Sequence, residues 1–89
     1  MKKSKTAAEK RYHDKVAALG CLICGSPANV HHIREDMGAS MRSSHYLVIP
    51  LCREHHQGEF SIHNSPREFK NIYGSELELL ADTIGRLEK

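Results

Sequence analysis

Apolar residues recur at helical spacing over residues 5–19, a stretch that contains no Gly or Pro. Such spacing gathers apolar side chains on one face, which is typical of an amphipathic helix packed on a core. Gly20 follows and supplies a stop. The sequence therefore predicts a helix that ends before Gly20. Its expected apolar face consists of Ala8, Tyr12, Val16 and Leu19.

Two short apolar runs come next, at residues 29–33 and 46–51, separated by a polar loop rich in Gly, Ser, Met and Arg. Runs of this length bounded by turn-forming residues predict strands, here paired as an irregular β-hairpin. The segment from Cys52 to His56 has no β-branched residue, and Gly58 lies close behind it. It predicts a short helix directly after the second strand.

The pattern after residue 64 predicts a further helix. Ser65 is a suitable N-cap, Pro66 suits the first helical position, and Glu68 completes a capping box. We expect this helix to run to about Tyr73 and to end at Gly74.

A second capping pattern, Ser75 with Glu78, predicts one more helix that continues to the end of the sequence. Apolar residues at helical spacing predict the face that it buries. These residues are Leu77, Leu80, Ile84 and Leu87.

The core that 89 residues can bury is small, and only 39% of the residues are apolar. Domains of this size usually need an additional staple. Three cysteines cannot all pair with one another, and the Cys21-Leu22-Ile23-Cys24 loop is too tight to gain much as a disulfide. No apolar run approaches the roughly 18 residues of a membrane span, and no signal-peptide pattern opens the chain. We therefore expect one metal-stapled domain over residues 1–89, located in a reducing cytoplasm.

The net charge is only +2, but the basic residues are concentrated near the start. We expect residues 1–5 to form a basic, flexible arm in which Lys2, Lys3 and Lys5 contact nucleic-acid phosphates. The alternative is that these lysines only solubilise the frayed end of the first helix.

Two pairs of metal-ligating residues stand at the spacing of zinc knuckles. Cys21 and Cys24 form the first pair, and Cys52 and His55 form the second. Two such pairs can close a tetrahedral site, so the sequence predicts one structural zinc ion. The alternative is a set of unrelated buried thiols.

Histidines are unusually dense, since six of the seven lie in the range from His31 to His63. If His55 binds the structural zinc, then His31, His32 and His56 have no structural role. Histidine clusters close to cysteines often indicate metal coordination, so a second metal site is implied.

The segments CLIC, VHHI and PLCREHH occur in that order and resemble the HNH, or ββα-metal, nucleases. The likeness implies a small α+β fold, a zinc-stapled ββα-metal unit with an N-terminal helix and two C-terminal helices. Within that superfamily the sequence is most similar to the phage recombination-enhancement (Ref-type) nucleases, through HHIRE, a Met-Gly-x-Ser loop, YLVIPLC and FKNIYGSELELL. This second likeness covers about residues 10–82. It implies DNA as substrate, the recombinase RecA as a partner, and a phage or prophage protein in a bacterial cell.

By position in the family motif, His31 and His56 resemble ligands of a catalytic divalent metal, and His32 resembles the general base. His63 could complete the metal site from the following loop, or it could be a surface histidine or a phosphate contact. Imidazole ligands accept Mn²⁺, Zn²⁺ or Ni²⁺, whereas Mg²⁺ would be held mainly by phosphate oxygens and water.

The sequence departs from the family pattern because the middle Asn is absent and Ser44-His45 occupies that region. His45 could orient His32 in its place, through a ring nitrogen bonded to a backbone carbonyl, or it could be an exposed histidine at the start of a strand. Arg34, Arg42 and Arg53 flank the predicted site and could clamp phosphates, although each could equally be a solvated surface residue.

The resemblance thus implies a metal-dependent endonuclease that hydrolyses DNA phosphodiester bonds. The main alternative is a non-catalytic zinc module that binds DNA or protein, in which the remaining histidines are incidental. The role of His32 distinguishes the two.

Overall fold

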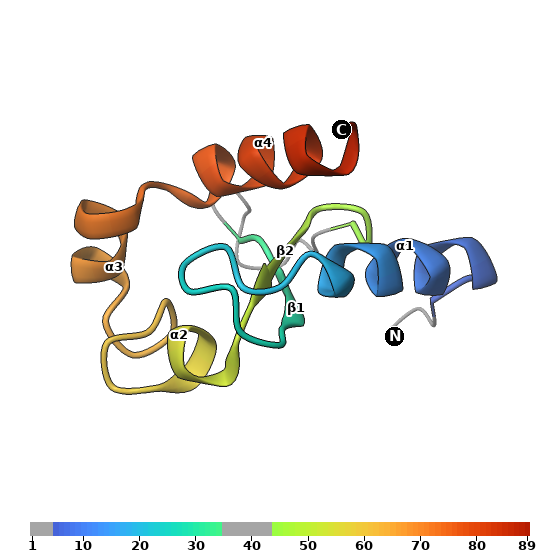
Figure 1. Ribbon diagram of the computed structural model, residues 1–89. Helices are drawn as coiled ribbons and strands as arrows, with labels where there is room; N and C mark the ends of the chain where they lie inside the picture. The colour runs from blue at the N-terminus through green and yellow to red at the C-terminus, as the bar shows by residue number, and fades with distance from the viewer. Residues whose placement is uncertain (1–4, 35–43) are drawn as a thin grey trace.

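The elements of the chain are built around a two-stranded antiparallel sheet (Figure 1). The computed structural model describes residues 5–34 and 44–89. Within these residues the order of elements is α1 (Ala7–Ala18), β1 (Asn29–His32), β2 (Val48–Leu51), α2 (Arg53–Gln57), α3 (Pro66–Tyr73) and α4 (Glu76–Leu87). The described part of the chain is therefore a small mixed α+β fold, as the sequence predicted.

The hairpin register pairs Asn29 with Leu51 and His32 with Val48. All four residues of β2 are buried, because helices cover this strand. In Figure 1, α1 and α4 approach the hairpin from different sides, and α2 continues directly from the end of β2. The predicted strand pair and the short helix after it are confirmed, although β2 begins at Val48 rather than at Tyr46.

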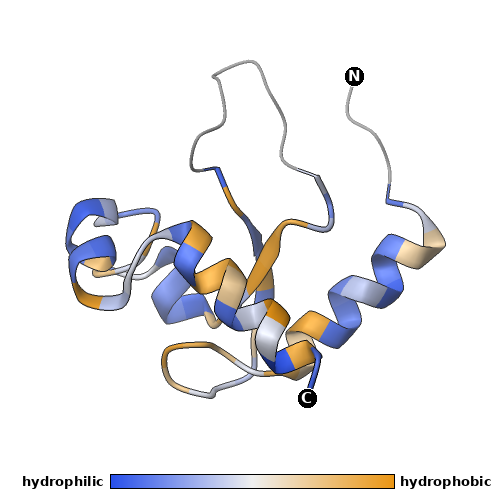
Figure 2. Ribbon diagram, turned by 90° about the horizontal axis from the view of Figure 1, so that it is seen from above, coloured by the Kyte–Doolittle hydropathy of each residue, from blue (hydrophilic) through white to orange (hydrophobic). Residues whose placement is uncertain are grey.

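The core lies between the hairpin, the cysteine-containing turns and the C-terminal helices. Figure 2 shows apolar residues both on β2 and along α4. No helix among the described residues is long and apolar enough to cross a membrane. The main buried cluster consists of Cys21, Ile33, Ile49, Leu51, Cys52, Phe69, Leu79 and Leu80.

Helix α1 begins with a capping box that the sequence analysis did not anticipate. The Glu9 amide donates to Thr6 Oγ1 at 3.1 Å, and the Thr6 amide donates to Glu9 Oε1 at 2.7 Å. The predicted apolar face is only partly right. Val16 is buried as expected, but Ala8 is exposed and His13 is buried in its stead. The reason is that the ring of His13 finds a hydrogen-bond partner inside the fold, as described below.

The capping box predicted for the third helix is wrong. Ser65 makes no side-chain cap, because its hydroxyl donates to the carbonyl oxygen of Glu59 at 2.9 Å and ties the preceding loop to the helix. Pro66 does occupy the first helical position, and Gly74 ends the helix with a φ of 107°, which favours glycine.

The second predicted capping box is confirmed. The Glu78 amide donates to Ser75 Oγ at 3.1 Å, and the Ser75 amide donates to Glu78 Oε1 at 2.9 Å.

The predicted apolar face of α4 is partly wrong. Leu77 and Ile84 are 44% and 46% exposed, whereas Leu79, Leu80 and Thr83 are buried. The helix is therefore rotated so that Thr83 faces inward. Its hydroxyl donates to the Leu79 carbonyl at 2.9 Å, which removes the cost of burying an unpaired polar group.

Candidate functional site

Strand β1 supplies two adjacent histidines to two different places in the fold. Successive side chains of a strand point to opposite faces, so His31 and His32 cannot serve one site together. His31 is buried and lies near His56 and His63, whereas half-buried His32 lies near His13 and His45. Together with the cysteine cluster, the described residues thus form three groups of possible metal ligands.

The first group is the predicted zinc site, and the structure brings all four of its residues together. The ligand atoms of Cys21, Cys24, Cys52 and His55 lie within 4.8 Å of one another. Cys24 Sγ and Cys52 Sγ are 3.7 Å apart, and His55 Nδ1 lies 3.2 Å from Cys52 Sγ and 3.7 Å from Cys21 Sγ. A tetrahedral zinc ion with Zn–S bonds of about 2.3 Å would separate its ligand atoms by roughly 3.5 to 3.8 Å. The four residues therefore fit a metal ion such as zinc.

Local backbone bonds shape this cluster. The Cys21 amide donates to the Ser26 carbonyl at 2.8 Å, and the Gly25 amide donates to the Cys21 carbonyl at 2.9 Å. Gly25 accommodates the turn with a φ of 78°. Hydrogen bonding with Ser26 lowers the pKa of the Cys24 thiol to about 6, which favours the thiolate that binds metal, while burial raises the pKa of Cys52.

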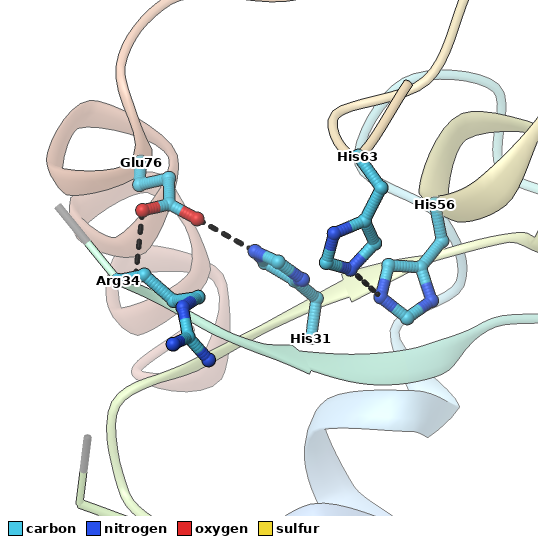
Figure 3. A network of polar contacts seen from close by, with 5 residues as sticks. All are labelled: His31, Arg34, His56, His63 and Glu76. Carbon is cyan, nitrogen blue, oxygen red and sulfur yellow. Dashed lines mark hydrogen bonds and ion pairs between the residues drawn. The ribbon is translucent and has the colours of Figure 1, made fainter. Parts of the chain in front are cut away.

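The second group consists of His31, His56 and His63, the three predicted ligands of a catalytic metal. Their ligand atoms lie within 4.8 Å of one another, and His56 Nε2 is 3.0 Å from His63 Nε2. Figure 3 shows the three rings side by side. Nitrogens that share a tetrahedral ion would lie about 3.3 Å apart, so the arrangement suits a cation held by imidazoles.

These three rings come from β1, α2 and the loop after α2. His55 and His56 are neighbours on a helix with 3.6 residues per turn, so they point in directions about 100° apart and reach different clusters. The loop is held by Asn64, whose amide donates to the carbonyls of Gln57 and Gly58 at 2.8 and 2.9 Å. This places His63, whose position the sequence left open, beside His56.

Burial and neighbouring histidines favour the neutral rings of His56 and His63. Burial is the main cause that lowers the pKa of His56, and the nearby His31 and His63 lower it further. Burial also lowers the pKa of His63, followed by the effect of His31. A neutral imidazole is the form that offers a lone pair to a cation.

Glu76, which the sequence analysis did not single out, completes the surroundings of His31. Its Oε2 lies 2.6 Å from His31 Nε2, and its Oε1 accepts the Arg34 amide at 2.7 Å. An acidic residue in the first turn of a helix is ordinarily explained by the helix dipole. Nothing local in the sequence connects position 76 with position 31, so this contact could not be predicted.

The third group consists of His13, His32 and His45, and His13 was also missed. His32 Nε2 lies 3.0 Å from His45 Nδ1, and His13 Nε2 lies 2.5 Å from the carbonyl oxygen of His45. A carbonyl can only accept, so His13 carries its proton on Nε2, and its Nδ1 can accept from Lys5 Nζ at 3.4 Å. A histidine one residue from the predicted apolar face of the first helix was the available signal.

The His45 ring contacts His32 directly. The backbone carbonyl of His45 accepts a hydrogen bond from the ring of His13. Burial lowers the pKa of His32 to about 4, helped by the nearby His13 and His45. At neutral pH the His32 ring is therefore uncharged.

The residues predicted to contact phosphates differ in where the structure places them. Arg34 is exposed and helps to line a cavity of about 340 Å³ together with His31, His63 and Lys70. Arg53 is exposed at the start of α2. Lys5 contacts His13 instead of extending freely as an arm. Arg42, Lys2 and Lys3 lie outside the described residues.

Comparison with curated proteins and with family models finds relatives of this sequence. The uncharacterized protein YdfU of Escherichia coli (strain K12) is 37% identical over 81 residues, which cover 88% of this chain and 22% of YdfU. The chain thus spans about a fifth of the length of that relative. A family model described as "Protein of unknown function (DUF968)" matches residues 1–87. With a match over nearly its whole length, the chain belongs to the DUF968 family.

Proposed function

We propose that this chain is a metal-dependent endonuclease of the HNH type that hydrolyses DNA phosphodiester bonds. The observation that supports the proposal is that the adjacent residues His31 and His32 lie in two different histidine groups. His31 lies in a group of three imidazoles suited to a cation, while His32 is neutral and lies on the opposite face of β1. A cysteine-rich cluster beside them could hold the structural zinc that such a small unit needs.

His32 is the proposed general base. It would take a proton from a water molecule while that water oxygen attacks phosphorus and the bond to the 3′ oxygen breaks. The departing 3′ oxygen takes a proton from solvent water, so the products are a 5′-phosphate and a 3′-hydroxyl. A ring that is neutral at neutral pH is in the protonation state that this role requires.

His31, His56 and His63 are the proposed ligands of the catalytic ion. When bound, a divalent ion such as Mg²⁺ or Mn²⁺ supplies charge neutralisation at a nonbridging oxygen and at the leaving 3′ oxygen. The same imidazoles would accept Zn²⁺ or Ni²⁺. Arg34 lines the cavity beside this group, and its proposed role is to contact a phosphate of the cleaved DNA strand.

His45 and His13 are proposed to orient the base. His45 contacts His32 directly, and His13 fixes the backbone carbonyl of His45 from helix α1. Ser44-His45 occupies the region in which the family pattern has an Asn. The finer likeness to recombination-enhancement nucleases adds two proposals, a RecA-type recombinase as partner and a role in phage recombination. Their support is the sequence segments alone.

One observation favours the alternative of a non-catalytic zinc module. His13 Nε2 and His32 Nε2 both lie within hydrogen-bonding distance of His45, so the two rings could serve only to hold His45 against α1 and β1. In that case the cysteine cluster would organise a binding domain. Cleavage by variants distinguishes the two functions.

The test is cleavage of supercoiled plasmid in Mg²⁺ or Mn²⁺ by purified variants. His32→Ala should bind the ion but lose activity by about two to four orders of magnitude, the usual contribution of a positioned base. His56→Ala should instead weaken ion binding. The control is Arg67→Ala, at an exposed position on α3, which should cleave like the native protein. Native-rate cleavage by His32→Ala would contradict the assignment.

A further inference from the structure

Helix α4 reaches the three-histidine group through the side chain of its first residue, Glu76. The carboxylate bonds His31 with one oxygen and the Arg34 amide with the other, at 2.6 and 2.7 Å. His31 is 4% exposed and Glu76 is 14% exposed, so water competes weakly for this contact. Both bonds anchor the end of β1 to the start of α4.

The geometry of His31 fixes which of its nitrogens can bind a cation. Figure 3 shows its ring between Glu76 on one side and the pair of His56 and His63 on the other. A carboxylate only accepts hydrogen bonds, so His31 Nε2, which contacts Glu76 Oε2, carries the ring proton. In a neutral ring this leaves Nδ1 with its lone pair, on the side away from Glu76.

We propose that Glu76 is a positioning residue that holds His31 in the Nε2–H form and orients its Nδ1 toward the ion shared with His56 and His63. This inference rests on the proposed function. A carboxylate behind a histidine ligand fixes the ring and makes the other nitrogen more basic. The negative charge also offsets part of the positive charge that an ion brings into a cavity lined by Arg34 and Lys70.

Neither helix capping nor an interaction with the helix dipole accounts for the position of the Glu76 carboxylate. The cap of α4 is already formed by Ser75 and Glu78, so the helix start does not need the Glu76 carboxylate as a cap. A carboxylate that served only the helix dipole would remain in solvent, whereas this one reaches a buried imidazole.

The first measurement is a titration with Mn²⁺, in which electron paramagnetic resonance detects binding while zinc is retained in the cysteine cluster. Mn²⁺ prefers nitrogen and oxygen ligands to thiolates, so it reports on histidine sites rather than on the cysteine cluster. Glu76→Ala should lower Mn²⁺ affinity by about 10- to 100-fold. Glu76→Gln keeps the length and one accepting oxygen but loses the charge, so its affinity should fall between those of the native protein and Glu76→Ala. The control is Glu68→Ala, which removes an exposed carboxylate from α3 and should leave the affinity unchanged.

The second measurement does not depend on metal or on a variant that folds. Long-range ¹H–¹⁵N spectra of the native, metal-free histidine site at neutral pH should show the His31 proton on Nε2. A proton on Nδ1 would overturn the proposal. So would a folded Glu76→Ala protein that binds Mn²⁺ as tightly as the native chain.

Failure of this inference and failure of the nuclease proposal give different results. A protein whose Mn²⁺ affinity depends on Glu76 but which cleaves no DNA overturns the nuclease function alone. A protein that cleaves DNA while Glu76→Ala keeps native affinity overturns the positioning role alone. A native protein that binds no Mn²⁺ at the three histidines overturns both.

Discussion

At the scale of single residues, neighbours in sequence have separate tasks in this fold. His31 and His32 diverge because a strand alternates its faces, and His55 and His56 diverge because a helix turns by about 100° per residue. Each pair therefore distributes its imidazoles between two clusters. The motifs VHHI and REHH can be read from the sequence. The cluster that each of their histidines joins is known only from the structure.

The zinc assignment predicts a specific defect for Cys52→Ala. Loss of one thiolate from the four-ligand cluster should lower both zinc content and thermal stability, because binding free energy at such a site is folding free energy. Metal analysis and thermal unfolding before and after chelation measure the effect. Chelation should lower the unfolding temperature of the native protein and should change that of the variant little. The assignment is wrong if Cys52→Ala keeps full zinc and its stability after chelation.

The lowered pKa of His32 predicts how stability depends on pH. The folded-state pKa is about 4 and the ordinary value is 6.5, so between these values the unfolded chain binds a proton that the folded chain excludes. The free energy of unfolding should therefore fall as the pH drops from 6.5 toward 4. The lowered pKa values of His56 and His63 act in the same direction.

Urea unfolding across this pH range measures the slope. Acid also protonates zinc ligands, so the informative quantity is the difference between the native protein and His32→Asn, both loaded with zinc. The variant should lose less stability on acidification. Equal slopes for the two proteins would show that His32 does not titrate as described.

At the scale of elements, the end of α1 and the cysteine turn depend on each other. Gly20 has a φ of 81°, and a Cβ atom there would lie 2.9 Å from the carbonyl oxygen of Gly25. The close approach holds Cys21 where the other three ligands can reach it. A side chain at position 20 would strain the backbone and push the turn away.

Gly20→Ala should therefore destabilise the protein by about 1–3 kcal/mol. Gly85→Ala is the matched control, because a Cβ at that helical position meets nothing within 4 Å. It should stabilise α4 by up to about 1 kcal/mol. Urea unfolding of both variants measures the contrast, and equal effects of the two changes would refute the structural reason given for Gly20.

At the scale of the whole molecule, the hairpin links three groups of ligands that arise far apart in the chain. The cysteine group joins the turn after α1 to α2, the second histidine group joins β1 to the loop after α2, and the third joins α1 to β1. Glu76 then connects α4 to the second group. Displacement of α1, β1 or α2 would therefore disturb more than one site.

The basic residues near the start of the chain predict salt-dependent DNA binding. If Lys2 and Lys3 contact phosphates, each contact makes the slope of log affinity against log salt concentration more negative by about 0.9. Lys2→Ala combined with Lys3→Ala should flatten the slope without changing sequence preference. Lys89→Ala, an exposed lysine at the other end of the chain, is the control. An unchanged slope in the double variant would dismiss the basic arm.

The sequence by itself determined the local structure and the ligand pairs. Spacing of apolar residues, Gly20, Gly74 and the Ser75 cap act within a few residues, so the helix ends and the hairpin could be predicted. Knuckle spacing likewise identified the cysteine group. The tertiary structure alone decided that His13 is buried, that Thr83 rather than Ile84 faces the core, and that Ser65 bonds Glu59 instead of capping its helix. It also brought Glu76 to His31 across 45 positions. Such contacts depend on how helices dock on the sheet, and the free energy of that docking is set by residues distant in sequence, which no local pattern encodes.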